Sequence, residues 1–135
     1  MKQISQAELN SWLDALAVES TLIAPVDVAG VLLYRPVQGN REIAWGFTRP
    51  EMSVKNAFFP ITDRILSIQK DRGQVKLTET LPDGKQVIFG VRPCDAHGLT
   101  ILDAVFINKL PVDPYYATRR ENTILVGLAC QEMHP

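Results

Sequence analysis

Two short apolar runs, each leading to a cysteine, constrain the fold of this chain more than any other feature of its sequence. The first, Gln86–Val91, leads into Arg92-Pro93-Cys94-Asp95, and the second, Thr123–Ala129, ends at Cys130. Runs of this length with few polar residues are typical of strands buried on both faces of a sheet. Between them, apolar residues recur at helical spacing: Leu99, Leu102, Val105 and Phe106. The pattern predicts a β-α-β crossover with parallel strands, so that both cysteines emerge at one edge of the sheet, where open α/β sheets bind ligands.

The N-terminal third predicts one helix and one hairpin. A capping-box pattern precedes a periodic apolar face, which predicts a helix from about Gln6 to Ala17. The β-rich stretch Thr21–Tyr34 is expected to be broken into two pieces by Pro25. Apolar and other residues then alternate over Ile43–Phe47, which predicts a half-buried strand, and Gly39-Asn40 marks the turn before it.

The middle of the chain predicts a second hairpin. The runs Val75–Thr80 and Gln86–Val91 flank Pro82-Asp83-Gly84, whose proline and glycine fit a type I turn. The preceding stretch, Ile61–Lys70, is compatible with a strand or a helix, and the helical spacing of its apolar residues favours a helix.

The last third is expected to hold two helices and to complete one α/β domain over residues 1–135. Asp95 is placed to cap the helix that follows the first cysteine, and Tyr115–Glu121 has the pattern of a short helix. We therefore expect an α/β fold: a mixed sheet with N-terminal hairpins, a C-terminal parallel β-α-β unit, and helices packed on the sheet.

Composition and charge exclude several classes of function. The net charge is −1, and acidic and basic residues are mixed along the chain, so no nucleic-acid-binding surface is expected. The polar N-terminus lacks the apolar core of a secretory signal, and no apolar run reaches the roughly 20 residues of a membrane helix. Two cysteines in 135 residues do not make a disulfide framework. We expect a cytoplasmic protein without membrane insertion.

Cys94 and Cys130 are the candidate metal ligands. The N-terminus of the following helix and Arg92 both favour a thiolate at Cys94, whereas Asp95 opposes it. A thiolate can bind a metal or act as a nucleophile, and the alternative is a small structural cysteine buried beside a strand end. Cys130 occupies the equivalent place after the next strand, which favours a shared site. Because zinc and iron sites need about four ligands, the two cysteines predict half of a site.

Two further readings use the same edge of the sheet. A phosphate-bearing cofactor such as a flavin is the first alternative, because the switch point of the sheet is a usual place for one. The candidate cofactor-binding residues are Arg92, Cys94, Asp95, Arg119 and Arg120. The last two arginines fit an ion pair within the chain at least as well. A redox dithiol of Cys94 and Cys130 ranks last, because the cysteines lie 36 positions apart and not in a CxxC motif.

Several segments of the sequence together resemble one protein family. They are Phe89–Ala96, Ile101–Phe106, Asp113–Thr123 and Val126–Cys130, and the Phe58-Phe59-Pro60 segment also fits. Their pattern is similar to the N-terminal domain of the iron–sulfur subunits of sulfhydrogenase (the beta subunit) and of anaerobic sulfite reductase (the A subunit), a 4Fe-4S dicluster family. The resemblance is strong over residues 54–130 and looser before them.

The resemblance implies a role in electron transfer. In that family the chain continues past the equivalent of Cys130 into a Cys-Phe-Cys segment and a ferredoxin-like pair of CxxCxxCxxxCP motifs, which hold two [4Fe–4S] clusters. None of those motifs is in this sequence, so we expect these 135 residues to bind no cluster alone and to be inactive in isolation. The implied task is that of a scaffold and docking domain. Its implied partners are other subunits of a cytoplasmic oxidoreductase of the hydrogenase or sulfite reductase type, including a flavin-bearing one.

Overall fold

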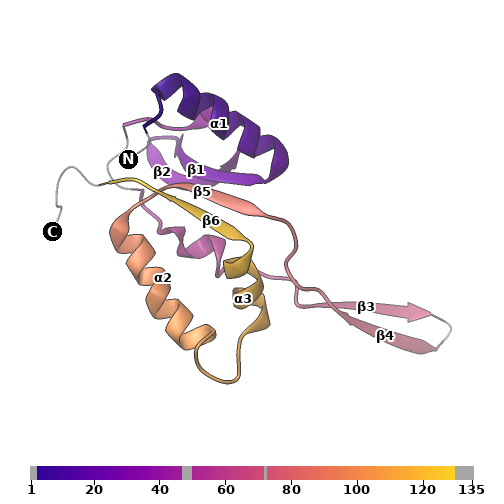
Figure 1. The fold of residues 1–135 in the computed structure, drawn as a ribbon. Helices are drawn as coiled ribbons and strands as arrows, with labels where there is room; N and C mark the ends of the chain where they lie inside the picture. Colours follow the sequence, from indigo (N-terminus) through magenta and orange to yellow (C-terminus); the bar gives the residue numbers. More distant parts are fainter. Residues whose placement is uncertain (1–2, 47–49, 72, 130–135) are drawn as a thin grey trace.

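The computed structural model describes residues 3–46, 50–71 and 73–129, which form a layered α/β body and a projecting pair of strands (Figure 1). Four strands make the main sheet in the order β2-β1-β5-β6, and β3 pairs with β4 in a separate sheet. The elements are α1 (Gln6–Glu19), β1 (Thr21–Val28), β2 (Val31–Val37), the 3-10 helices η1 (Asn40–Glu42) and η2 (Val54–Ala57), β3 (Leu66–Asp71), β4 (Gln74–Glu79), β5 (Gln86–Val91), α2 (Pro93–Phe106), α3 (Pro114–Glu121) and β6 (Thr123–Gly127).

The direction of the strands confirms the predicted α/β fold with its parallel C-terminal unit. β5 pairs in parallel with β6, and Gln86 lies opposite Thr123. β1 also runs parallel to β5, whereas β2 is antiparallel to β1. The carboxyl ends of β5 and β6 therefore lie at the same edge of the sheet. The helix α2 begins directly after β5, so its N-terminus lies at that edge (Figure 1).

Two apolar cores lie on opposite faces of the sheet. The core under α1 is formed by Leu13, Leu22, Ala24, Val37, Ile43, Val87 and Phe89. The core against η2, α2 and α3 is formed by Ile23, Val54, Phe58, Ile88, Val91, Leu99 and Tyr116. Because successive residues of a strand point to opposite faces, a strand that serves both cores must be apolar throughout. This explains why the run in β5 is unbroken.

Gly90 interrupts the regular alternation of β5. The register with β6 shifts between Phe89 and Val91, and Gly90 has a φ of 82°. A backbone with positive φ at a bulge is a conformation that glycine adopts without strain. The bulge lets Phe89 face the α1 core while Val91, two residues later, faces the α2 core.

The N-terminal hairpin differs from the prediction in two ways. Pro25 does not break the strand, because the ladder between β1 and β5 ends at Ile23 and Pro25 pairs with β2 alone. The turn falls at Ala29-Gly30, where both residues have positive φ, and not at Gly39-Asn40. The strand predicted over Ile43–Phe47 is wrong for its described part, which follows η1 as a turn with Ile43 buried.

The second predicted hairpin is also wrong. β4 pairs with β3, and β5 joins β1 and β6 in the other sheet, so Pro82-Asp83-Gly84 is a connection between sheets. The stretch expected to be a helix, Ile61–Lys70, contains most of β3 instead. Its apolar residues Leu66 and Ile68 alternate with polar ones, and this period of two outweighs the weaker helical spacing. We call the β3–β4 hairpin, Leu66–Asp71 with Gln74–Glu79, the arm.

Candidate cysteine site at the carboxyl edge of the sheet

Cys94 is an exposed thiol in the first turn of α2. The helix begins one residue earlier, at Pro93, and Arg92 is its N-cap residue. Proline is common at this first position, because its missing N–H has no partner there in any case. The Arg92 guanidinium nitrogen Nη2 donates a hydrogen bond to Sγ of Cys94, over 3.1 Å.

Asp95 lies within the first turn of α2, so the prediction that it caps this helix is wrong. The proline at 93 fixes a helical φ and starts the helix there, three residues earlier than expected. The Asp95 carboxylate instead accepts a hydrogen bond from Ser53 Oγ at 2.7 Å and lies 3.7 Å from Arg92 Nε. Since Ser53 also caps η2, this carboxylate joins two elements that are distant in sequence.

Tyr34 of β2 completes the buried side of this edge. Its hydroxyl donates to the Gly90 carbonyl over 2.9 Å, across the position of β1 where Pro25 has no N–H to offer. Burial, with a smaller contribution from the Asp95 carboxylate, raises the pKa of Tyr34 well above its ordinary value. The phenol is therefore a fixed hydrogen-bond donor and not an acid at neutral pH.

The end of β6 runs beside this group. The Leu128 amide donates to the Val91 carbonyl at 2.9 Å, which holds the chain after β6 next to the start of α2. Cys130 lies outside the described residues, so the shared metal site and the redox dithiol both stay predictions. Within the described ranges, no group of three or more His, Cys, Asp or Glu side chains is arranged to hold a metal ion. Cys94 fits an iron–sulfur cluster as one exposed sulfur ligand.

Arg119 and Arg120 do not join Cys94. They precede β6, at the opposite end of the parallel strands from the start of α2. Arg119 Nη2 lies 2.6 Å from Asp63, and Arg120 Nε lies 3.1 Å from Asp103. These pairs match the reading in which the two arginines bind carboxylates of the chain.

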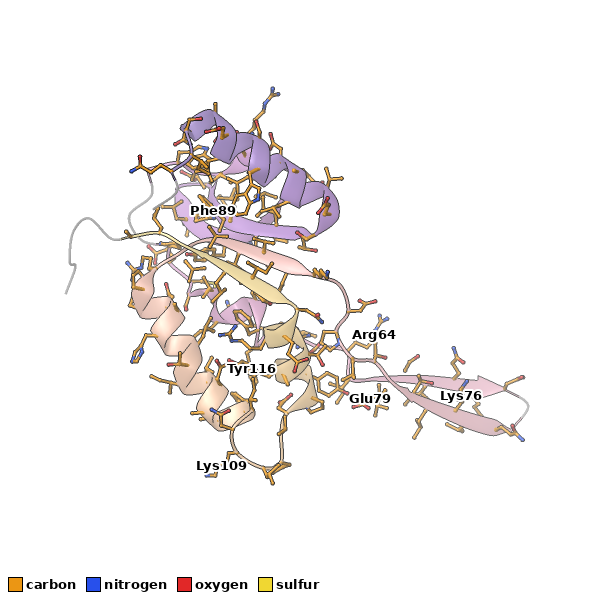
Figure 2. All side chains as sticks on the ribbon, in the orientation of Figure 1. Arg64, Lys76, Glu79, Phe89, Lys109 and Tyr116 are labelled. Carbon is orange, nitrogen blue, oxygen red and sulfur yellow. The ribbon has the colours of Figure 1, made fainter. Side chains whose placement is uncertain are left out.

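Asp103 is the centre of a network between α2 and α3. It accepts hydrogen bonds from Arg120 and, at 2.7 Å, from the hydroxyl of Tyr116. Burial and this bond to the carboxylate raise the pKa of Tyr116. Figure 2 shows Tyr116 between α2 and α3, away from the start of α2. Arg120 is therefore part of the packing between the two helices.

Two cavities in the described part of the chain lie away from Cys94. One of about 100 Å³ is lined by residues that include Lys85, Arg119 and Asn122, at the amino end of β5 and β6. Another of about 310 Å³ is lined by Asp14, Gln38, Gly39, Arg41 and Glu42, beside α1. Sites for drug-sized ligands usually have about 300–1,000 Å³ and enclose most of the ligand. The first cavity is too small for a flavin, and the second contains none of the candidate cofactor residues.

Sequence reasoning missed two members of the Cys94 edge, Tyr34 and Ser53. Both come from elements far away in the chain, and no local spacing connects them to the cysteine. Pro25 carried a usable signal for Tyr34, because a proline in a strand leaves a neighbouring carbonyl that another donor can satisfy. Ser53 carried the signal of a cap residue, but its partner becomes visible only when η2 and α2 are placed together.

Comparison with known proteins finds one informative relative. No family model and no solved structure matches the chain. The chain is 38% identical over 106 residues to sulfhydrogenase 2 subunit beta of Pyrococcus furiosus, an alignment that covers 78% of this chain and 30% of that protein. Among the helices that the structure describes, none is long and apolar enough to cross a membrane.

The fold is of the α/β class, and the similarity relates the chain to part of a longer sulfhydrogenase beta subunit. The chain belongs to the sulfhydrogenase beta subunit-like family. It spans about 30% of the length of the relative that it matches.

Proposed function

We propose that this chain is a scaffold and docking domain of an iron–sulfur electron-transfer subunit in a multi-subunit oxidoreductase. The observation that supports this most is the position of Cys94, exposed at the edge where β5 and β6 both end. The similarity to a sulfhydrogenase beta subunit supports the same class of role. Sulfite reductase is the other type of parent complex that the sequence pattern suggests.

In this proposal the chain holds one side of a cluster. A [4Fe–4S] cluster is usually held by four cysteine thiolates and carries single electrons. Cys94 would supply one ligand and Cys130 a second, and the remaining two would come from beyond these residues. Arg92 would keep its hydrogen bond to the sulfur, a type of contact that tunes cluster potentials. Asp95 and Ser53 would fix the helix start that presents the thiol.

The proposal includes the surroundings of the domain. We place it in the cytoplasm, as one domain over residues 1–135 of a longer subunit, and we propose other subunits as its partners, one of them flavin-bearing. The printed name of the relative describes a subunit, which supports an assembly. The domain alone has no catalytic activity in this scheme.

The test uses a full-length subunit that contains this sequence, purified without oxygen. We expect Cys94→Ser to lower its iron and acid-labile sulfide content and to remove the signal of one cluster from its paramagnetic resonance spectrum. His97→Ala is the matched control, because His97 is exposed in α2 and is not among the ligands that the proposal assigns to the cluster. Unchanged iron content and an unchanged spectrum in the serine variant would contradict the cluster.

A further inference from the structure

The arm is a prominent part of the molecule that the proposed function does not use. Its two strands project from the body into solvent (Figure 1), and eleven of its twelve residues in β3 and β4 are exposed. At its base, the Tyr115 hydroxyl of α3 lies 2.9 Å from the Ile65 carbonyl and 3.1 Å from Glu79 Oε1. These contacts fix where the arm leaves the body and leave its length uncovered by the described residues.

The two faces of the arm have different chemistry. Ile68 lies opposite Leu77, and the flanking pairs on the same face are Leu66 with Glu79 and Lys70 with Val75. These six residues form what we call the apolar face. The exposed fractions of its aliphatic side chains are 49% for Leu66, 67% for Ile68, 60% for Val75 and 62% for Leu77. The other face is polar throughout: Ser67, Gln69, Asp71, Gln74, Lys76 and Thr78.

An exposed apolar face of this kind is expected to be buried by contact with another molecule. A two-stranded ribbon alone in water is marginally stable, and a contiguous exposed apolar patch with polar surroundings usually marks a contact with another protein. In Figure 2, Glu79 lies at the base of the arm and Lys76 farther out along it. The aliphatic side chains of the apolar face are exposed, so another molecule can reach them.

The charged residues on the apolar face indicate which molecule packs against it. Lys70 lies near the tip and Glu79 near the base, with Ile68 and Leu77 between them. If a second copy packs on this face related by a twofold axis across the strands, the tip of each arm lies over the base of the other. Lys70 of each copy then lies beside Glu79 of the other, and the aliphatic pairs cover each other. Packing with both tips at one end would bring the two lysines together, which is unfavourable.

We propose that the arm is a self-association element, through which two copies of this chain pack their apolar faces against each other in antiparallel orientation. A twofold contact of this kind uses the same patch on both copies and closes as a dimer. Six-residue strands are about 20 Å long, so the buried area is at the low end of specific interfaces. The dimer is therefore weak and concentration-dependent.

The first experiment measures the mass of the 135-residue chain by sedimentation equilibrium over a range of concentrations, with reductant present. We expect a monomer–dimer equilibrium that is lost in the Ile68→Ser/Leu77→Ser variant. The matched control is Gln69→Ser/Lys76→Ser, which changes the neighbouring cross-strand pair on the polar face and should leave the equilibrium unchanged. Far-ultraviolet circular dichroism checks that both variants keep the fold of the body.

The second experiment tests the orientation by exchanging charges. Lys70→Glu and Glu79→Lys each place like charges together in the antiparallel dimer, and each should weaken self-association by on the order of tenfold. When the two single variants are mixed, both charge pairs of the mixed dimer are complementary, so association should return. This rescue depends on the contact between different copies and cannot arise from a change within one arm.

Two results would overturn the proposal. The first is a wild-type chain that stays monomeric at all concentrations, which would assign the apolar face to a different protein. The second is a dimer that persists in the Ile68→Ser/Leu77→Ser variant, which would place the contact elsewhere on the molecule. A dimer without rescue in the mixture would overturn the antiparallel orientation.

Discussion

At the scale of single residues, the hydroxyl of Tyr34 replaces a main-chain donor. Pro25 of β1 has no N–H, so the Gly90 carbonyl of β5 receives its hydrogen bond from the Tyr34 hydroxyl of β2, on the far side of β1. Buried carbonyl groups that lose a partner cost about 1–3 kcal/mol. The free energy of unfolding should therefore depend on this one oxygen atom.

Tyr34→Phe should lower the free energy of unfolding at neutral pH by about 1–2 kcal/mol, because the Gly90 carbonyl loses its donor. Urea denaturation followed by circular dichroism measures the change. Tyr115→Phe is the control, since it removes a hydroxyl that is exposed at the base of the arm and should have a smaller effect. An equal loss in both variants would mean that the Gly90 contact has no special weight.

The same residue gives a dependence on pH. Folding raises the pKa of Tyr34, so the folded state holds its proton more tightly than the unfolded state. This contribution is complete below the ordinary tyrosine pKa of about 10, and it is lost as the pH rises above that value. Stability should fall above about pH 10, and the fall should be shallower in Tyr34→Phe. Urea titrations at a series of alkaline pH values test this, and identical slopes would contradict it.

The residue types predicted where a reactive side chain lies better than they predicted which residues it contacts. Cys94 was correctly placed at the start of a helix after a buried strand, and the pairing of the arginines with carboxylates was among the alternatives. The role of Asp95 was wrong, because an aspartate before a helical pattern looks like a cap whether or not a proline starts the helix earlier. Tyr34 and Ser53 were missed, since hydrogen bonds across many residues leave no spacing in the sequence and the signals at Pro25 and Ser53 do not point to Cys94.

At the scale of elements, two glycines near Cys94 have opposite requirements. Gly90 has positive φ in the bulge of β5, where a side chain is strained. Gly98 lies in α2, where an added Cβ would be 3.0 Å from Cε of Lys55. That contact is with the flexible end of an exposed side chain, which can move away.

Gly90→Ala should destabilise the protein by about 1–2 kcal/mol, the usual cost of a left-handed conformation for alanine. Gly98→Ala should be neutral or stabilising by up to about 1 kcal/mol, because alanine favours a helix interior over glycine. Thermal unfolding of both variants measures the contrast. If both substitutions destabilise equally, the bulge carries no conformational requirement.

Elements with local signals were predicted and elements defined by their partners were not. The capping box of α1 was predicted because it is a contact between near neighbours in the sequence. The cap of α3 at Asp113 is equally local, but the sequence analysis did not name it. The crossover from β5 to β6 was confirmed because an apolar strand, a helix and a second apolar strand leave few arrangements. Alternation identifies a strand but not its neighbour, and this is why β4 was paired with β5 and not with β3.

At the scale of the whole molecule, the body and the arm should differ in local stability. β5 lies between β1 and β6 and contributes to both cores, whereas the arm has two exposed strands. Local opening is easiest where few apolar contacts are buried. In dilute solution, amide hydrogens of β3 and β4 should exchange fastest among the strands and those of β5 slowest. Hydrogen exchange read by mass spectrometry tests this order, and an arm as protected as β5 would contradict it.

The separation of the two cores by the sheet has a consequence for how sequences of this family diverge. Side chains of the α1 core do not pack against those of the α2 and α3 core, so the energetic effects of changes in the two should add. A related protein can then have different residues in one core without compensating substitutions in the other. β1 and β5 are the exceptions, because Leu22 and Ile23, like Val87 and Ile88, face different cores. Covariation between the two halves of the domain should therefore be concentrated in those two strands.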